Sequence, residues 1–472
     1  RSVCVLLCFF VFKEKTAYEM LRRLVGSEMC IRDRGDSVRG RLFNVTGDAI
    51  DGIGPVSKAN GYQIHNSPPA YEKLSTSSEI LYTGIKVIDF TGALSGPYCS
   101  MLLGDMGAEV IKIERPSRGD DSRSWGPPFI RDNLSTYFVS INRNKKSISL
   151  NLKESEAIEI VKKLIKDADV LLENFRPGVM EKLGLGYEEM KKINEKLIYC
   201  SISGFGQNGP YKFKTSYDLI LQGMGGLMSE TGESNGGPVK IGIAVTDISA
   251  GMFACYGILS AIIARCKTGT GQFIDISMLD CQVSWQTYFA TGYLFSGIIP
   301  SKTGSAHSLI CPYQSFKTKD IFINIAVGNE ETWKKFCEVL EIDIAEDEKY
   351  LDNGKRLENK DQLVKIIEDK LSKKSGEEWL HLLEKSGVPS GPIYTIDRLL
   401  NDSQVLHRKM IEEVTNPLYG TIKIPGLPVK LSNTKSMIKL SPPVLGEHTD
   451  EILKKLEYTD EQIESFRIRK LI

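Results

Sequence analysis

Apolar and polar positions follow two alternating periods from about Thr83 onward. Short β-branched or apolar runs predict six strands, at residues 84–90, 109–114, 147–152, 170–173, 197–203 and 272–277. Helix-period stretches lie between several of them, at 154–167 and 179–194, and Ser95-Gly96-Pro97 opens another helix, which Gly104 or Gly107 closes. Strands that alternate with helices of this length form βαβ units. The pattern predicts an α/β fold with a Rossmann-like, mostly parallel sheet.

The pattern changes after residue 302. A hairpin, two amphipathic helices and a turn-rich break are expected at 312–328, 330–340, 360–371 and 386–392. We therefore predict a large domain over 84–302 and a smaller α+β domain over 303–410. Residues 411–472 are expected to return to the large domain.

Two apolar runs raise the question of a membrane. Residues 2–12 are too few to span a bilayer, whereas Ile243–Ala264 is long enough and contains Asp247 as its one charged residue. A membrane helix is the alternative to a buried core helix for the second run. An aspartate near its start would be costly in lipid, so we expect a core helix and no membrane partner.

Charge and cysteine usage exclude other classes. Lys plus Arg (60) equals Asp plus Glu (60), which argues against nucleic acid as the main partner. The 10 cysteines include no CxxC pair and the 5 histidines are scattered, so no metal site is expected. This usage is typical of a reducing compartment, and we expect a cytoplasmic protein (mitochondrial matrix if the source is eukaryotic).

The first residues do not match the rest of the chain. Residues 1–34 resemble a translated sequencing adapter, and residues 35–89 resemble a fragment of the beta subunit of an F-type ATP synthase, so we expect a join near residue 83. The phosphate loop G-x-x-x-x-G-K-[ST] should follow that fragment, but GIKVID continues into FTGALSGPYC. We therefore reject a non-enzymatic, nucleotide-binding subunit, which is the alternative from another class.

A dinucleotide site is a further alternative. Glu114 follows the turn at Gly92 at roughly the distance found in Rossmann domains, but the turn reads G-A-L-S-G and not G-x-G-x-x-G. Arg115 comes directly after the acid and suits a phosphate better than a ribose diol. The sequence therefore disfavours a nicotinamide cofactor.

A set of motifs in one order identifies a family. They are DFTGALSGPYCSMLLGDMGAEVIKIERP, GDDSRSWGPPF, NRNKKSISLNLK, LLENFRPG, SISGFGQNGP, SYD, VTDISAG, GQFIDISMLD, SGVPSGP and LGEHTDEIL. From Gly84 to Ile472 the chain resembles the family III CoA-transferases (the CaiB/BaiF family), most closely the branch that moves CoA between succinate and glutarate or hydroxymethylglutarate. The resemblance implies an interlocked homodimer of ring-shaped subunits. It also implies coenzyme A and acyl-CoA as substrates, together with a carboxylic acid, and no permanently bound cofactor.

Asp247 in VTDISAG matches the nucleophilic carboxylate of the family. A carboxylate suits CoA exchange between two acids, because the mixed anhydride that it forms keeps the energy of the thioester. The residue opens an apolar helix, where free N–H groups and the helix dipole favour its ionised form, and Thr246 is expected to cap that helix. The alternative is an aspartate that only caps the helix.

Tyr217 and Asp218 match a pair that lines the CoA pocket of the family. The racemase branch has a histidine at the position of Tyr217, since racemisation needs two bases on opposite faces of the α-carbon. No histidine lies near position 217. We therefore prefer a transferase to the alternative, an α-methylacyl-CoA racemase.

The remaining matches concern the two substrates. Family positions for CoA fall on Arg115, Leu150, Lys153, Asn174, Phe175 and Lys182. For the far carboxylate of a dicarboxylic acceptor we predict Arg123 and Arg143, with Trp125 as a wall; the alternative is that both arginines only order loops. Leu94 and the loop at 304–313 depart from the formyl and oxalate members, so those acids are not expected.

Overall fold

The structure is a computed structural model that describes residues 84–131 and 134–472. The adapter-like segment (1–34) and nearly all of the ATP-synthase-like segment lie outside the described residues. The last residues of the latter, at the expected join, form the strand β1 (Lys86–Asp89), which pairs with neighbours on both sides.

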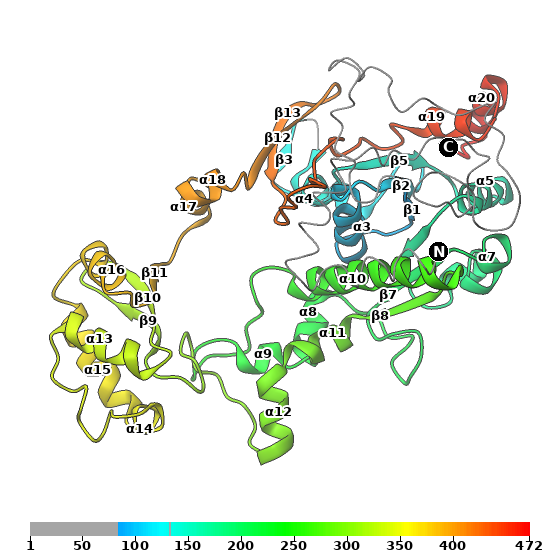
Figure 1. Cartoon of the computed structure of the whole chain (residues 1–472). Helices are drawn as coiled ribbons and strands as arrows, with labels where there is room; N and C mark the ends of the chain where they lie inside the picture. Colours follow the sequence, from blue (N-terminus) through cyan, green and yellow to red (C-terminus); the bar gives the residue numbers. More distant parts are fainter. Residues whose placement is uncertain (1–83, 132–133) are drawn as a thin grey trace, which may run out of the picture. The chain divides into compact units, whose positions relative to one another are not determined.

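A parallel sheet of six strands forms the centre of the large domain (Figure 1). Its members are β1, β2 (Glu109–Glu114), β5 (Lys145–Ser149), β6 (Val170–Glu173), β7 (Ile198–Ser203) and β8 (Phe273–Ser277). They lie in the order β5-β2-β1-β6-β7-β8, and every pairing is parallel. The order reverses between β1 and β6, as in a Rossmann fold, which confirms the expected fold class.

Helices cover both faces because successive strand side chains point to opposite sides. Ile88 packs into one core with α5 (Ser155–Lys166) and α7 (Tyr187–Ile193). Val87 packs into the other with α3 (Ser95–Asp105) and α10 (Val245–Thr268). The C-terminal helices α19 (Thr449–Lys455) and α20 (Asp460–Ile468) add Leu453 and Phe466 to the first core.

The apolar helix α10 buries only one of its faces. Among the described residues it is the one helix long and apolar enough to cross a membrane. Ala250, Ala254 and Ile258 pack against α3 and the sheet, whereas Met252 and Tyr256 are exposed. The helix expected in the core therefore packs there with one face and leaves the other exposed.

Glycines and a local distortion change two predicted boundaries. The helix expected at 179–194 is divided into α6 (Val179–Lys182) and α7, since Gly184 takes a left-handed conformation between them. The helical segment after β8 is likewise divided into α11 (Met278–Trp285) and α12 (Thr287–Ser296), where Thr287 has a positive φ. The helix that Ser95-Gly96-Pro97 opens begins at Ser95, so Pro97 is the third residue of α3.

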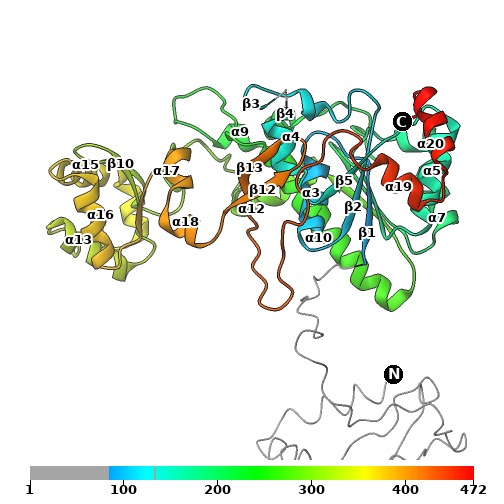
Figure 2. The ribbon, with the colours of Figure 1, turned by 90° about the horizontal axis from the view of Figure 1, so that it is seen from above.

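A separate core forms around a three-stranded antiparallel sheet (Figures 1 and 2). Its strands are β9 (Tyr313–Lys317), β10 (Phe322–Ala326) and β11 (Ser390–Pro392), and β9 and β10 form the expected hairpin. Its helices are α13 (Glu330–Leu340), α14 (Asn353–Glu358), α15 (Lys360–Leu371) and α16 (Gly376–Lys385). Trp333 and Phe336 are buried at its centre.

The remaining elements connect these parts. They are the 3₁₀ helix η5 (Asp121–Ser124), β3 (Phe129–Ile130), β4 (Leu134–Ser135), α4 (Thr136–Ile141), α8 (Asp218–Met224), α9 (Leu227–Glu230), α17 (Ile396–Leu400), α18 (Ser403–His407), β12 (Ile411–Asn416) and β13 (Gly420–Pro425).

Candidate active site

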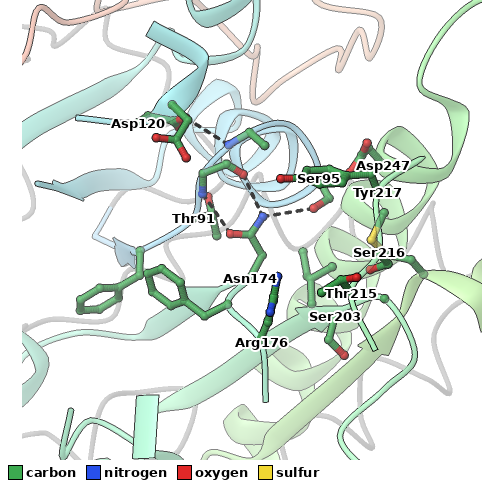
Figure 3. Close-up of a pocket in the computed structure, with 18 of the residues that line it drawn as sticks. Thr91, Ser95, Asp120, Asn174, Arg176, Ser203, Thr215, Ser216, Tyr217 and Asp247 are labelled. Carbon is green, nitrogen blue, oxygen red and sulfur yellow. Dashed lines mark hydrogen bonds between the residues drawn. The ribbon is translucent and has the colours of Figure 1, made fainter. Parts of the chain in front are cut away.

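A cavity of about 390 Å³ lies at the carboxyl ends of the parallel strands (Figure 3). Loops that follow β1, β2, β6 and β7 line it, together with Asp247 at the start of α10. In open α/β sheets, ligands bind at this edge and at the point where the strand order reverses. Gly92 and Asn174 stand on the two sides of that point, after β1 and β6.

Two side chains hold the loop between β1 and α3. Asn174 Oδ1 accepts a hydrogen bond from Gly92 N (2.9 Å), and Asn174 Nδ2 donates to Gly92 O (2.8 Å) and to Ser95 Oγ (3.3 Å). Asp120 Oδ1 accepts from Ala93 N (3.1 Å), and Ala93 has a φ of 63°. A non-glycine residue in this left-handed region costs roughly 1–2 kcal/mol. The side chains of Asn174 and Asp120 stabilise this conformation.

A layer of buried charges lies beneath the same loop. Lys112 Nζ lies 3.0 Å from Asp120 Oδ2, and Lys145 Nζ lies 3.4 Å from Asp89 Oδ2. Asp89 also accepts hydrogen bonds from Thr91 N (2.8 Å) and from a serine hydroxyl of α3. Burial lowers the pKa of Lys145 to about 8, although the charge of Asp89 opposes this change. Removing one partner of such a buried pair is strongly destabilising, because it leaves the other charge buried without a partner. The pairs therefore keep the loop in place.

Asp247 lies in the first turn of α10, and a carboxylate from another helix caps that turn. Asp218 Oδ1 accepts a hydrogen bond from Thr246 N (3.0 Å), and Asp218 Oδ2 accepts from Gln222 Nε2 (2.7 Å). The helix cap position is Ala244, which has no side-chain cap. The prediction that Thr246 caps the helix was wrong: its hydroxyl is buried without a hydrogen-bond partner among the described residues.

Burial raises the pKa of Asp247, the negative charge of Asp218 raises it too, and the proximity of the Ser95 hydroxyl and backbone N–H lowers it. Together these effects place the pKa of Asp247 at about 7. The carboxylate therefore titrates near neutral pH. A group that changes protonation in this range is typical of an active site.

The structure brings most of the expected residues together. Those that line the cavity are Asp247, Arg115, Leu150, Asn174, Phe175, Tyr217 and Trp125. Lys153 and Lys182 are exposed and do not line it. Asp218 lies behind Asp247, as the cap described above.

Both arginines predicted for the acceptor acid are held in ion pairs. Arg123 donates two hydrogen bonds to Glu114 (2.7 and 2.6 Å) and stacks over an aromatic ring. Arg143 donates two to Asp105 (2.9 and 2.7 Å) and one to the Pro425 carbonyl (2.7 Å), and it is almost completely buried. Neither lines the cavity. This arrangement is the one described by the alternative, in which the arginines order loops.

Several residues of the site were not predicted from the sequence. Arg176, Lys212 and Lys214 line the cavity and bring positive charge to it. Lys214 Nζ also lies 3.7 Å from the centre of the Tyr211 ring. The alternation of lysine with aromatic residues in PYKFKTSY was the available signal for this loop.

Tyr137 was also missed. Burial, together with the charges of Asp247 and Asp218, raises its pKa to about 12, so its hydroxyl keeps its proton and can donate. Its ring packs edge-on against Trp125, with centroids 4.9 Å apart. No motif could indicate it, because only the folded chain brings α4 toward α10.

The sheet order, the cavity at its reversal point and a carboxylate with a raised pKa define an α/β protein with a candidate active site. The family model for CoA-transferase family III matches residues 82–449, and the chain belongs to this family. It is therefore a CoA-transferase, as the motifs indicated.

The chain is similar to individual CoA-transferases and to a solved structure of the family. The chain is 44% identical over 379 residues to "Succinyl-CoA:glutarate CoA-transferase" of Mus musculus, covering 80% of this chain and 87% of that protein. It is 41% identical over 383 residues to "Succinate--glutarate CoA-transferase" of Agrobacterium fabrum, covering 79% and 95%. The crystal structure of a CaiB/BaiF family protein from Brucella suis aligns with a TM-score of 0.71 at 39% identity, covering 79% of this chain and 98% of that one.

Proposed function

We propose that the enzyme moves CoA from succinyl-CoA to a dicarboxylic acid such as glutarate or hydroxymethylglutarate. The names of the relatives in mouse and Agrobacterium fabrum support this choice of acids. The observation that carries the proposal is the carboxylate of Asp247, which lines the cavity and titrates near neutral pH.

In the proposed reaction, ionised Asp247 attacks the thioester carbonyl of succinyl-CoA. The carbon–sulfur bond breaks, CoA leaves as the thiolate, and a succinyl–aspartyl anhydride forms. The thiolate then attacks the aspartyl carbonyl, which gives an aspartyl–CoA thioester and releases succinate. The acceptor carboxylate repeats these two steps in reverse and leaves as its CoA thioester, with Asp247 restored.

CoA carries several phosphate charges, and we place them near the cations of the cavity. Arg115, Arg176, Lys212 and Lys214 line it. Arginine and lysine bind phosphate oxygens through charged hydrogen bonds. The aromatic ring of Phe175 provides an apolar surface for the uncharged part of the substrate.

The second copy of the chain is part of the proposal. Large apolar side chains on and after α12 are strongly exposed, with Leu294 at 82% and Phe295 at 94%. Apolar patches of this kind mark association surfaces, and the family resemblance implies a homodimer. Light scattering coupled to size exclusion should give twice the mass of one chain, and a monomer at micromolar concentration would contradict it.

The reaction is tested by trapping. Incubation with succinyl-CoA alone, followed by hydroxylamine, should leave a hydroxamate on the peptide that contains Asp247. The Asp247→Asn enzyme should form none and should lose several orders of magnitude in rate, on the scale of roughly 10⁴-fold. A racemase would instead exchange the α-hydrogen of a 2-methylacyl-CoA with deuterated water and give no adduct. That result would overturn the proposal.

A further inference from the structure

Ser95 and Asp247 line the same cavity, and Asn174 Nδ2 donates a hydrogen bond of 3.3 Å to Ser95 Oγ (Figure 3). We infer that Ser95 is a catalytic residue, whose hydroxyl, oriented by Asn174, donates a hydrogen bond to the Asp247 carboxylate and supports it as nucleophile and leaving group. The inference rests on the proposed function of Asp247.

The hydrogen-bond inventory of Asn174 sets the direction of this contact. Its Oδ1 accepts from Gly92 N, and its Nδ2 donates to Gly92 O and to Ser95 Oγ. These contacts fix the orientation of the amide, because exchanging O and N would place donor against donor at Gly92. A serine hydroxyl has a single proton, and one that accepts from an amide still has that proton to donate. Ionised Asp247 is an acceptor and is the neighbouring carboxylate.

The backbone of Ser95 offers a second donor beside the hydroxyl. Ser95 is the first residue of α3, so its N–H has no acceptor within the helix. Close packing of α3 and α10 makes the contact possible: a Cβ on Gly251, one turn after Asp247, would lie 2.5 Å from Ser95 O. The starts of α3 and α10 therefore pack closely together beside the cavity that Asp247 lines.

These donors matter in both directions of the proposed reaction. They favour the ionised form of Asp247, which is the form that attacks, and so oppose the effect of burial. In the last step the CoA thiolate attacks the acyl carbonyl of the acceptor anhydride, the electron pair of the broken C–O bond returns to the Asp247 oxygen, and the hydroxyl stabilises the charge that develops there. Ser95 thus acts on the reacting atoms themselves.

The test is the pH dependence of transfer by the full chain. In Ser95→Ala, the acid limb of kcat/KM should move up by about one pH unit, since a charged hydrogen bond is lost, and activity at pH 6 should fall about tenfold from this shift alone. Ser95→Thr keeps a hydroxyl and should return the limb toward the wild-type position. Ser203→Ala is the matched control: its hydroxyl also lies at the cavity, without a hydrogen-bond partner among the described residues, and its loss should leave the midpoint unchanged.

A second readout does not depend on the reaction. Carbodiimide couples a protonated carboxyl group to glycine ethyl ester, and mass spectrometry of the Asp247 peptide gives the labelling midpoint. That midpoint should also rise in Ser95→Ala. An unchanged midpoint in both measurements would overturn the inference while leaving the proposed function standing. If the wild type formed no hydroxamate on Asp247, the proposed function would be overturned. The carbodiimide labelling would still show whether Ser95 lowers the pKa of Asp247.

Discussion

Asp218 Oδ1 accepts a hydrogen bond of 3.0 Å from Thr246 N, so one carboxylate caps the helix that presents another. The negative charge of Asp218 disfavours the ionised form of Asp247 and so raises its pKa. The cap also holds Asp247 in the cavity, in the first turn of α10 and not on a loop.

Removing the charge of Asp218 should shift the activity profile. In Asp218→Asn, the pKa of Asp247 falls, and the acid limb of kcat/KM should move to lower pH by up to about one unit. The amide oxygen can still accept from Thr246 N, but the new NH₂ group faces Gln222 Nε2, so we expect a modest loss of thermal stability. Asp218→Ala removes the cap as well and should cost about 1 kcal/mol in free energy of unfolding. A limb that moves upward in Asp218→Asn would contradict this account.

Asp247→Asn should stabilise the protein at alkaline pH. In the wild type the pKa of Asp247 is about 7 in the folded state, against an ordinary value of 3.8. Between these two values the folded state retains a proton that the unfolded chain has released. The stability contributed by this carboxyl is complete below about pH 4 and is lost as the pH rises through about 7. At pH 8 the free energy of unfolding of the variant should exceed that of the wild type by roughly 1–3 kcal/mol, and this difference should vanish near pH 4. Urea melts at both pH values measure this, and an equal gain at both would contradict it.

Gly251→Ala should disturb the site without changing any polar group. The added Cβ would lie 2.5 Å from Ser95 O and 3.2 Å from Tyr98 Cδ1, so α3 and α10 must separate. We expect a loss of about 1–3 kcal/mol in stability and a fall in kcat that exceeds the change in KM for succinyl-CoA. Gly257→Ala, further along the same helix, would have side-chain carbons of Ile274 and Ile276 and no backbone atom as its three nearest neighbours, the closest at 3.2 Å, and serves as the control. Equal kinetic effects in both variants would show that the contact with Ser95 is unimportant.

Arg143→Ala should act on stability and not on acid selectivity. The variant leaves the buried Asp105 carboxylate without its cation, which typically costs about 3–5 kcal/mol. The ratio of KM values for glutarate and a monocarboxylate of similar length should stay constant. A selective rise in KM for glutarate would return this arginine to acceptor recognition.

Lys214→Ala and Arg176→Ala should weaken the binding of the CoA substrate. Each loses one charged hydrogen bond to a phosphate in the proposed complex, and we expect KM for succinyl-CoA to rise about tenfold. Succinyl-dephospho-CoA identifies the phosphate concerned, because a residue that binds the 3′-phosphate should show no further loss with it. Lys153→Ala, at an exposed lysine outside the cavity, is the control. Equal losses in all three variants would remove Lys214 and Arg176 from the binding site.

The strands and their order along the chain were predictable because their signals are local. Val87 and Ile88 belong to opposite cores, as the two-residue period of a strand requires. Gly92 and Asn174 each follow a predicted strand, and parallel strands end at one edge, so their meeting at the cavity could be anticipated. Asp247 was found through a motif that is contiguous in the sequence.

The tertiary structure alone decided which partners these residues meet. Asp105 pairs with Arg143 on a distant strand end, and Asp218 takes the capping role expected of Thr246. Such pairings depend on how helices and loops pack in three dimensions, and residue type carries no signal for them. Ser95 shows this most directly: a serine at a helix start is ordinary in sequence, and it packs against α10, beside the cavity that Asp247 also lines, because Gly251 lets the two helices approach closely. Local periodicity sets the elements, whereas the distances between reacting groups follow from packing, which sums contacts over the whole core.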